Sequence, residues 1–146
     1  MSFYQTGKPD HIREEVASVS DRKKKILICD DSLLIRKKMI MALENIGDFD
    51  LIEAVDGNKV VDLYTREKPD LVLLDLVMPE QDGLKCLEKI KFSDHKAYIV
   101  MITSTGTKEN LQKALTLGAD DFLQKPWNDQ DLSNIISKLT GGDTIV

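Results

Sequence analysis

Short apolar runs alternate with segments of helical period from residue 25 onward. The clearest runs, at 26–29 and 71–74, are apolar at every position, which is typical of strands covered on both faces of a parallel sheet. We expect five strands, at about 26–29, 51–54, 71–74, 97–102 and 122–124. A helical segment follows each strand. The pattern predicts an α/β fold, a doubly wound five-stranded parallel sheet with five helices.

Cap residues mark the predicted helices. Ser32 can cap the first helix and Gly47 can stop it, while Asn58 can cap a second helix that ends before Pro69. The third helix holds Leu84, Leu87 and Ile90, the fourth runs from about Lys108 to Leu117, and the last from Asn128 or Asp129 to Leu139. The apolar residues that we expect along the first helix are Leu33, Leu34, Met39, Ile40, Leu43 and Ile46.

The chain length sets the number of domains. With 146 residues it can build one good hydrophobic core, and no Gly/Ser-rich linker divides it. We expect one domain over 25–141, a polar extension over 1–24 and a short tail over 142–146. Ile12, Val16 and Val19 have helical spacing in the extension, but three apolar residues make a marginal helix, so a mobile arm is favoured.

Charge and composition exclude several classes of protein. The chain has 25 acidic and 20 basic residues, a net charge of −5, which disfavours a surface for nucleic acid. Residues 1–25 carry +2, so the acidity lies in the rest of the chain. No run reaches the roughly 18 apolar residues of a membrane span, and no signal peptide is evident. Cys29 and Cys86 read as small buried residues. These features predict a cytoplasmic protein without membrane insertion or direct nucleic-acid binding.

Polar residues follow the predicted strands at the points where the strands end. Asp30 and Asp31 follow the first strand and Asp75 the third, while the fourth and fifth end at Thr103 and Lys125. In an open α/β sheet the ligand site lies outside the carboxyl ends of the strands, so these side chains should converge. Three clustered carboxylates repel one another unless a cation neutralises them. Oxygen ligands of this kind suit Mg²⁺, or Mn²⁺.

This residue set suits phosphoryl transfer. With a divalent cation bound, Asp75 stays ionised and can attack phosphorus as a nucleophile. The Lys125 ammonium and the Thr103 hydroxyl can bind the phosphoryl oxygens and stabilise charge in the transferring group. Asp30 and Asp31 alone could simply cap a helix, but acids at the ends of two buried strands are a costly coincidence.

At these residues the chain resembles the receiver domains of bacterial two-component response regulators, and in particular the stand-alone chemotaxis receiver. The likeness covers about Lys25 to Leu139, and its four motifs are individually weak but strong together and in order. The matching stretches are Ile28 to Ser32, Pro69 to Asp75 with Met78-Pro79 and Asp82-Gly83, Val100 to Thr103, and Gly118 to Phe122 leading into Lys125-Pro126.

The resemblance implies a role for each residue. Asp75 is the phosphoacceptor, and Asp31, Asp75 and the backbone carbonyl of Val77 are direct Mg²⁺ ligands, with Asp30 acting largely through water. Thr103 is the switch hydroxyl and Phe122 the switch aromatic, and a cis peptide bond is expected between Lys125 and Pro126. The family fold has the strand order 2-1-3-4-5.

Three neighbouring residues bear on the geometry of the switch and on the lifetime of the acyl phosphate. Ser104 stands where the family commonly has Ala, which affects the geometry beside the switch aromatic. Val77 and Thr105 occupy positions that tune hydrolysis of the acyl phosphate, and neither carries an acid or amide to orient water. We therefore expect a phosphoryl group that is not unusually short-lived.

The resemblance also implies partners. A sensor histidine kinase or phosphotransfer protein would supply the phosphoryl group, and the fourth helix, fifth strand and last helix, about 108–138, would bind a separate target protein. Alternatives are a phosphorylation-independent scaffold or adaptor, and an intermediate in a multistep phosphorelay. A hydrolase of the aspartyl-phosphate type lacks its second acid, since that place is Val77, and no glycine motif favours a nucleotide or flavin. The chain would catalyse its own phosphorylation and dephosphorylation, so whether to label it an enzyme stays open.

Overall fold

Five parallel strands form the centre of the protein in a computed structural model that describes residues 22–78, 82–104 and 107–140. The strands are β2 (Lys25–Cys29), β3 (Asp50–Ala54), β4 (Leu71–Asp75), β5 (Ile99–Thr103) and β6 (Asp121–Gln124). Their order in the sheet is β3-β2-β4-β5-β6, which confirms the predicted order 2-1-3-4-5. Because every strand runs the same way, all five carboxyl ends lie at one edge.

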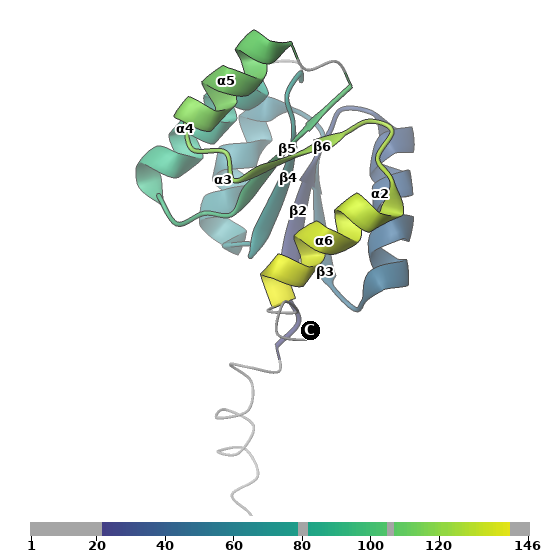
Figure 1. Cartoon of the computed structure of the whole chain (residues 1–146). Coiled ribbons are helices and arrows are strands. Elements are labelled where there is room, and N and C mark those ends of the chain that lie inside the picture. The colour runs from purple at the N-terminus through teal and green to yellow at the C-terminus, as the bar shows by residue number, and fades with distance from the viewer. Residues whose placement is uncertain (1–21, 79–81, 105–106, 141–146) are drawn as a thin grey trace, which may run out of the picture.

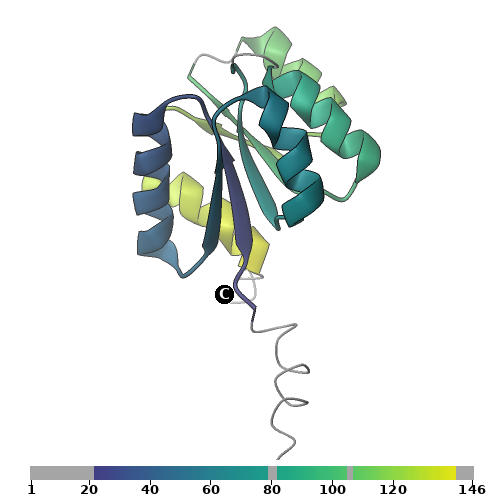
Figure 2. The ribbon, with the colours of Figure 1, turned by 180° about the vertical axis from the view of Figure 1, so that it is seen from behind.

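Helices cover both faces of the sheet (Figures 1 and 2). One face is covered by α2 (Leu33–Ile46) and α6 (Asp129–Thr140). The other is covered by α3 (Gly57–Glu67), α4 (Gly83–Ser93) and α5 (Lys108–Thr116). No helix in the described part of the chain is long and apolar enough to cross a membrane.

Alternate residues of each central strand enter opposite cores. Leu27 and Leu74 pack beneath α3 and α4, whereas Ile28 and Leu73 pack beneath α2 and α6. All five residues of β4 are buried, as are all five of β5. This explains why residues 71–74 and 99–102 are apolar at every position and do not alternate with polar residues.

Both cysteines are buried, as expected. Burial raises the pKa of the Cys29 thiol well above its usual value, and Cys86, Asp30 and Asp75 raise it further. Burial is also the main reason that the pKa of Cys86 rises to about 11. A raised thiol pKa suppresses the reactive thiolate, so both cysteines are structural residues.

The apolar residues expected along the first helix all lie in α2, but not all of them are buried. Leu33 and Leu34 are 57% and 63% exposed, while Arg36 is buried together with Met39 and Leu43. These three lie three and four residues apart and so share one stripe of the helix. Leu33 and Leu34 lie in the first turn of the helix and are exposed despite their apolar character.

Helix starts differ from the prediction at one place. The cap of α3 is Asp56, whose side chain accepts a hydrogen bond from the backbone N–H of Asn58 at 2.9 Å. Asn58 is therefore inside the helix rather than its cap. Ser32 caps α2 as predicted by accepting a hydrogen bond from Ile35 N, and Gly47 follows its last residue. The extension with Ile12, Val16 and Val19 lies outside the described residues.

Candidate functional site

The sheet edge at the carboxyl ends of the strands brings together the side chains that the sequence singled out. Asp30, Asp75 and Thr103 are buried there, with 0%, 6% and 7% of their surface exposed. Asp31 is exposed at the rim. Buried charged groups are costly unless they are paired or bind a ligand, so this concentration at one edge marks a site.

The three acids are spaced for a metal ion. One carboxylate oxygen from each of Asp30, Asp31 and Asp75 lies within 4.8 Å of the other two. Asp30 Oδ2 is buried and accepts no hydrogen bond from the described residues. An oxygen cluster with an unused buried lone pair suits a hard divalent cation such as Mg²⁺. The donor set therefore fits the ion predicted from the sequence.

Lys125 reaches into the acidic cluster from the end of β6. Its Nζ lies 2.7 Å from Asp30 Oδ2 and 3.2 Å from Asp75 Oδ2. It donates a hydrogen bond to Asp75, whereas its contact with Asp30 is a close ion pair without hydrogen-bond alignment. A single ammonium thus faces two buried carboxylates, and one negative charge stays uncompensated.

The pKa values reflect this imbalance. Burial is the main cause that raises the pKa of Asp75, the Asp30 carboxylate adds to it, and Lys125 only partly offsets both. For Lys125, burial lowers the pKa, but the combined effect of Asp30 and Asp75 raises it above its usual value. Lys125 is therefore held as a cation, while the acidic cluster favours any further positive charge.

Backbone contacts hold the acids in place. Ser32 N donates to Asp30 Oδ1 at 2.9 Å, and Asp30 N donates to the carbonyl of Ala54 on β3. Val77 N donates to Asp75 Oδ1 at 3.2 Å, while the Val77 side chain is 73% exposed. These bonds occupy one oxygen of each buried carboxylate and leave the second oxygen facing the cluster.

The loop after β4 depends on a glycine. The Gly83 N–H bonds the carbonyl of Leu76 at 2.9 Å, and a Cβ at this position would collide with the backbone carbonyl oxygen of Asp75. Asp82, just before it, caps α4 by accepting a hydrogen bond from Lys85 N. Asp82 and Gly83 thus have structural roles, Asp82 as the cap of α4 and Gly83 in close contact with the backbone of Asp75 and Leu76.

Thr103 and Phe122 share a cavity of about 340 Å³ beside α5, which is also lined by Leu111, Gln124 and Asp131. Phe122 is half-buried in this position. The backbone N–H of Lys125 donates to the Thr103 carbonyl at 2.7 Å, and the Lys125–Pro126 bond is cis, as expected. Ser104 is exposed, and Thr105 lies outside the described residues.

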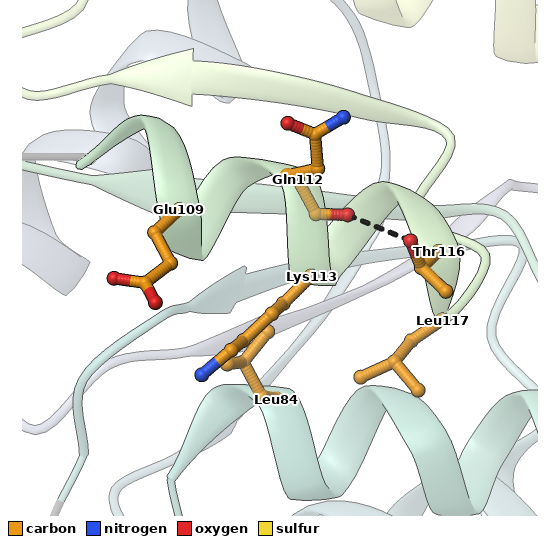
Figure 3. A pocket seen from close by; sticks show the side chains of 6 residues that line it. All are labelled: Leu84, Glu109, Gln112, Lys113, Thr116 and Leu117. Carbon is orange, nitrogen blue, oxygen red and sulfur yellow. Dashed lines mark hydrogen bonds between the residues drawn. The ribbon is translucent and has the colours of Figure 1, made fainter.

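A separate groove of about 480 Å³ lies between α4 and α5. Figure 3 shows its lining, with Leu84 and Leu117 in the groove and Lys113 extended beside Leu84. Glu109, Gln112 and Thr116 complete the lining. It contains none of the residues of the acidic cluster.

Arg36 is a site neighbour that the sequence prediction missed. Its Nη1 donates to the backbone carbonyl of Asp30 at 2.8 Å, and its Nε pairs with Glu53 on β3, also at 2.8 Å. The available signal was its helical spacing, three residues before Met39 and seven before Leu43, on the buried stripe of α2. Because a charged residue in a predicted helix is normally expected to face solvent, this spacing was not taken as a sign of burial.

Comparisons with known proteins agree with the geometry. A family model described as the response regulator receiver domain matches residues 26–137. The chemotaxis protein CheY of Halobacterium salinarum is 37% identical over 115 residues, which cover 78% of this chain and 94% of that protein. A CheY-like receiver domain protein structure from Methanospirillum hungatei is 29% identical with a TM-score of 0.75, over 85% of this chain and 99% of that one.

A chain from the CheX–CheY–BeF3–Mg²⁺ complex of Borrelia burgdorferi is 30% identical to this one. Its TM-score is 0.74, and the match covers 80% of this chain and 88% of that chain. The receiver fold therefore extends over the whole described sheet and its helices.

Proposed function

The chain belongs to the response regulator receiver family, and on that premise we propose that it accepts a phosphoryl group on Asp75 and then binds a separate target protein. One observation carries the proposal. Asp75 is a buried carboxylate at the end of a central strand, flanked by two further acids and by the Lys125 ammonium. This combination suits a nucleophile that needs one cation to stay ionised and another to receive the phosphoryl oxygens.

The donor is a phosphohistidine on a sensor kinase or phosphotransfer protein. A carboxylate oxygen of Asp75 bonds to phosphorus while the bond from phosphorus to the histidine nitrogen breaks, and the nitrogen keeps the electron pair. Lys125 and the Thr103 hydroxyl bind the phosphoryl oxygens as charge shifts onto them. The product is an aspartyl phosphate and a free imidazole.

Mg²⁺, or Mn²⁺, when bound neutralises charge between Asp75 and the phosphoryl oxygens. Asp31, Asp75 and the Val77 carbonyl would hold it directly, and Asp30 would act through a water molecule. The acid spacing and the unused lone pair on Asp30 Oδ2 support this assignment. The Mg²⁺ in the Borrelia CheX–CheY complex supports the choice of ion.

Thr103 and Phe122 form the switch. Both line the cavity beside α5, so movement of the Thr103 hydroxyl toward a phosphoryl group vacates space that the Phe122 ring can enter. That shift would alter the outer surface of α5, β6 and α6, about 108–138, where the target binds. The phosphoryl group biases two states that already exist in equilibrium.

The kinase must approach the acidic edge to deliver the phosphoryl group. The first turn of α2 exposes Leu33 and Leu34 beside Asp31, and this apolar pair offers contact area to the incoming partner. Kinase and target thus use different surfaces. The CheX–CheY complex supports protein partners for this fold.

The expected lifetime of the aspartyl phosphate follows from its neighbours. The Val77 side chain is exposed and apolar, so it cannot orient a water molecule for attack on phosphorus. We expect decay over minutes or longer in Mg²⁺ alone. Decay within seconds, followed with radiolabelled phosphate, would contradict this expectation.

The proposal is tested with acetyl phosphate and Mg²⁺. The wild-type chain should acquire one acyl phosphate, which is labile to acid, base and hydroxylamine, and Asp75→Asn should acquire none. Asp62→Asn is a matched control, because Asp62 is exposed on α3 and pairs only weakly with Arg66 at 3.8 Å. Equal labelling of Asp75→Asn and the control would sink the assignment. Target binding that is unchanged in Asp75→Asn would instead favour a phosphorylation-independent scaffold.

A further inference from the structure

Arg36 is a buried cation on the helix that follows the two acids. Only 8% of its surface is exposed, and it lies on the stripe of α2 that also buries Met39 and Leu43. A guanidinium in such a place is costly unless hydrogen bonds and a counterion compensate it. A methionine or leucine would fill the same stripe at no such cost. Arg36 therefore calls for an explanation other than packing.

The contacts of Arg36 lead to the acidic turn. Nη1 donates to the Asp30 backbone carbonyl at 2.8 Å, in a fully buried hydrogen bond. Nε pairs with Glu53 Oε1 at 2.8 Å, and the Glu53 side chain is 43% exposed at the edge strand β3. The planar guanidinium thus spans from the turn to the neighbouring strand. A lysine has no such fork and cannot make both contacts in this geometry.

The bonded carbonyl joins the two acids. It belongs to the peptide unit between Asp30 and Asp31, and a peptide unit is planar. Holding that oxygen therefore fixes the plane from which both residues project. Asp30 is held further by Ala54 through its N–H and by Ser32 through Oδ1, whereas exposed Asp31 depends on the orientation of this plane.

We propose that Arg36 is a positioning residue for the divalent-cation site, which sets the affinity for the ion by fixing the Asp30–Asp31 peptide plane. The inference rests on the proposed function of the acidic cluster. Glu53 has a supporting role: it neutralises the guanidinium, which would otherwise repel the incoming cation. Outer contacts that orient metal ligands typically change metal affinity by about 10- to 100-fold when removed.

A positioning role and a purely electrostatic role for Arg36 predict opposite effects of Arg36→Met on cation binding. If Arg36 acted only through its charge, Arg36→Met would remove a positive charge near the site and strengthen cation binding. If it acts by position, Arg36→Met weakens binding although a repelling charge has gone. Arg36→Lys separates the two roles further, since it keeps the positive charge but loses the planar guanidinium that makes both contacts.

The test measures Mn²⁺ binding to the full chain by the electron paramagnetic resonance signal of the free ion. Arg36→Met and Arg36→Lys should each weaken Mn²⁺ binding about tenfold relative to the wild type. Arg66→Met is the matched control, because it removes the same charge from the exposed surface of α3, and it should bind within twofold of the wild type. Circular dichroism checks that each variant is folded.

A second measurement separates positioning from general damage. With acetyl phosphate as donor, Arg36→Met should need about tenfold more Mg²⁺ for half-maximal phosphorylation and reach the same rate at saturating Mg²⁺. If Arg36→Met fails to fold, the Mn²⁺ affinity of Arg36→Lys tests the inference by the same limits. Mn²⁺ binding within twofold of the wild type, or tighter, in a folded variant would overturn the inference. A wild-type chain without Mn²⁺ binding would instead overturn the proposed function, and this inference with it.

Discussion

Two lysine–aspartate clusters lie at opposite edges of the same sheet. At the amino edge, before β5 and β6, Lys91 Nζ lies 3.0 Å from Asp120 Oδ2. At the carboxyl edge, Lys125 Nζ lies within 3.2 Å of Asp30 and Asp75. The two lysine side chains are similarly covered, with 13% and 15% exposed. Burial alone does not distinguish the clusters.

The difference lies in how completely each cluster is satisfied. Lys91 also donates to the carbonyls of His95 and Ala97, and Asp120 Oδ2 also accepts from Ile99 N at 2.8 Å. One cation meets one anion, and the remaining polar capacity is used by the backbone. This cluster fastens the end of α4 to the starts of β5 and β6 through contacts within the protein.

The cluster at the carboxyl edge is left incomplete. One cation meets two buried acids with a third at the rim, and Asp30 Oδ2 accepts no hydrogen bond from the described residues. Burial and the charge of Asp30 raise the pKa of Asp75. A buried ion pair whose charges balance needs no further ion, whereas a buried cluster with an excess of negative charge marks a place for a further cation.

The largest expected effect is on phosphorylation. Lys125→Met should slow labelling by acetyl phosphate about 100-fold, because a group that stabilises charge in the transferring phosphoryl is lost. Lys91→Met makes the same substitution at the other edge and should change the rate less than threefold. Initial rates at saturating Mg²⁺ provide the measurement. Equal losses in the two variants would erase the functional contrast between the clusters.

The next largest effect is on stability, where Lys91→Met should now lose more than Lys125→Met. Lys91→Met should lower the free energy of unfolding by about 2–3 kcal/mol, because it removes the ammonium that pairs with Asp120 and donates to two carbonyls. Lys125→Met in saturating Mg²⁺ should cost less than about 1 kcal/mol, since the ion can neutralise the acids. Urea titrations compare the two. A larger loss of unfolding free energy in Lys125→Met than in Lys91→Met would contradict the proposed difference between the two clusters.

Mg²⁺ itself should act at one edge only. At a concentration tenfold above its dissociation constant, it should stabilise the wild-type chain by about 1.4 kcal/mol. Most of this gain should vanish in Asp75→Asn and remain in Asp120→Asn, which changes an acid of the satisfied cluster. Thermal unfolding with and without Mg²⁺ measures the gain. A gain that survives in Asp75→Asn would place the ion elsewhere.

The smallest effect is a pH dependence without metal. Because its pKa is raised, Asp75 binds its proton more tightly in the folded than in the unfolded chain, so ionisation at neutral pH costs folding stability. Asp75→Asn should therefore stabilise the chain at pH 7 by about 1 kcal/mol, the scale of one net hydrogen-bond or charge interaction. The gain should shrink as the pH falls through the raised pKa toward the usual carboxyl value of 3.8.

Urea titrations of both chains in a metal chelator, at pH 7 and at about pH 4, measure this difference. Other acids titrate alike in the two chains and cancel. A gain that stays constant between the two pH values would show that the Asp75 charge is not the cause.

The sequence determined the outline of the site because strand ends can be read directly. Buried runs that stop at Asp30, Asp75, Thr103 and Lys125 must meet at one edge if the strands are parallel. The same residues carried the resemblance to the receiver family, the resemblance implied the strand order, and both the family and the order are confirmed. The individual roles of the site residues stay predictions, which the variants above test.

The sequence could not reveal which polar side chains of the helices turn inward. Leu33 and Leu34 are apolar residues of α2, yet both are exposed, while the charged Arg36 is buried. Lys91 likewise reads as a solvated charge, but its contacts bridge residues that are far apart in the chain, such as Asp120. Local periodicity describes a single element and cannot report its partner across the sheet.

The sequence alone thus determined which chemical groups lie at the carboxyl edge, because the residue at which each buried strand ends can be read directly along the chain. Only the tertiary structure decided which buried charges are satisfied. Lys91 is completed by two carbonyls and Asp120, Arg36 by Glu53 and the Asp30 carbonyl, and Asp30 Oδ2 is left without a donor aligned to it. Satisfaction depends on distances and angles between elements, and these are set by packing in three dimensions.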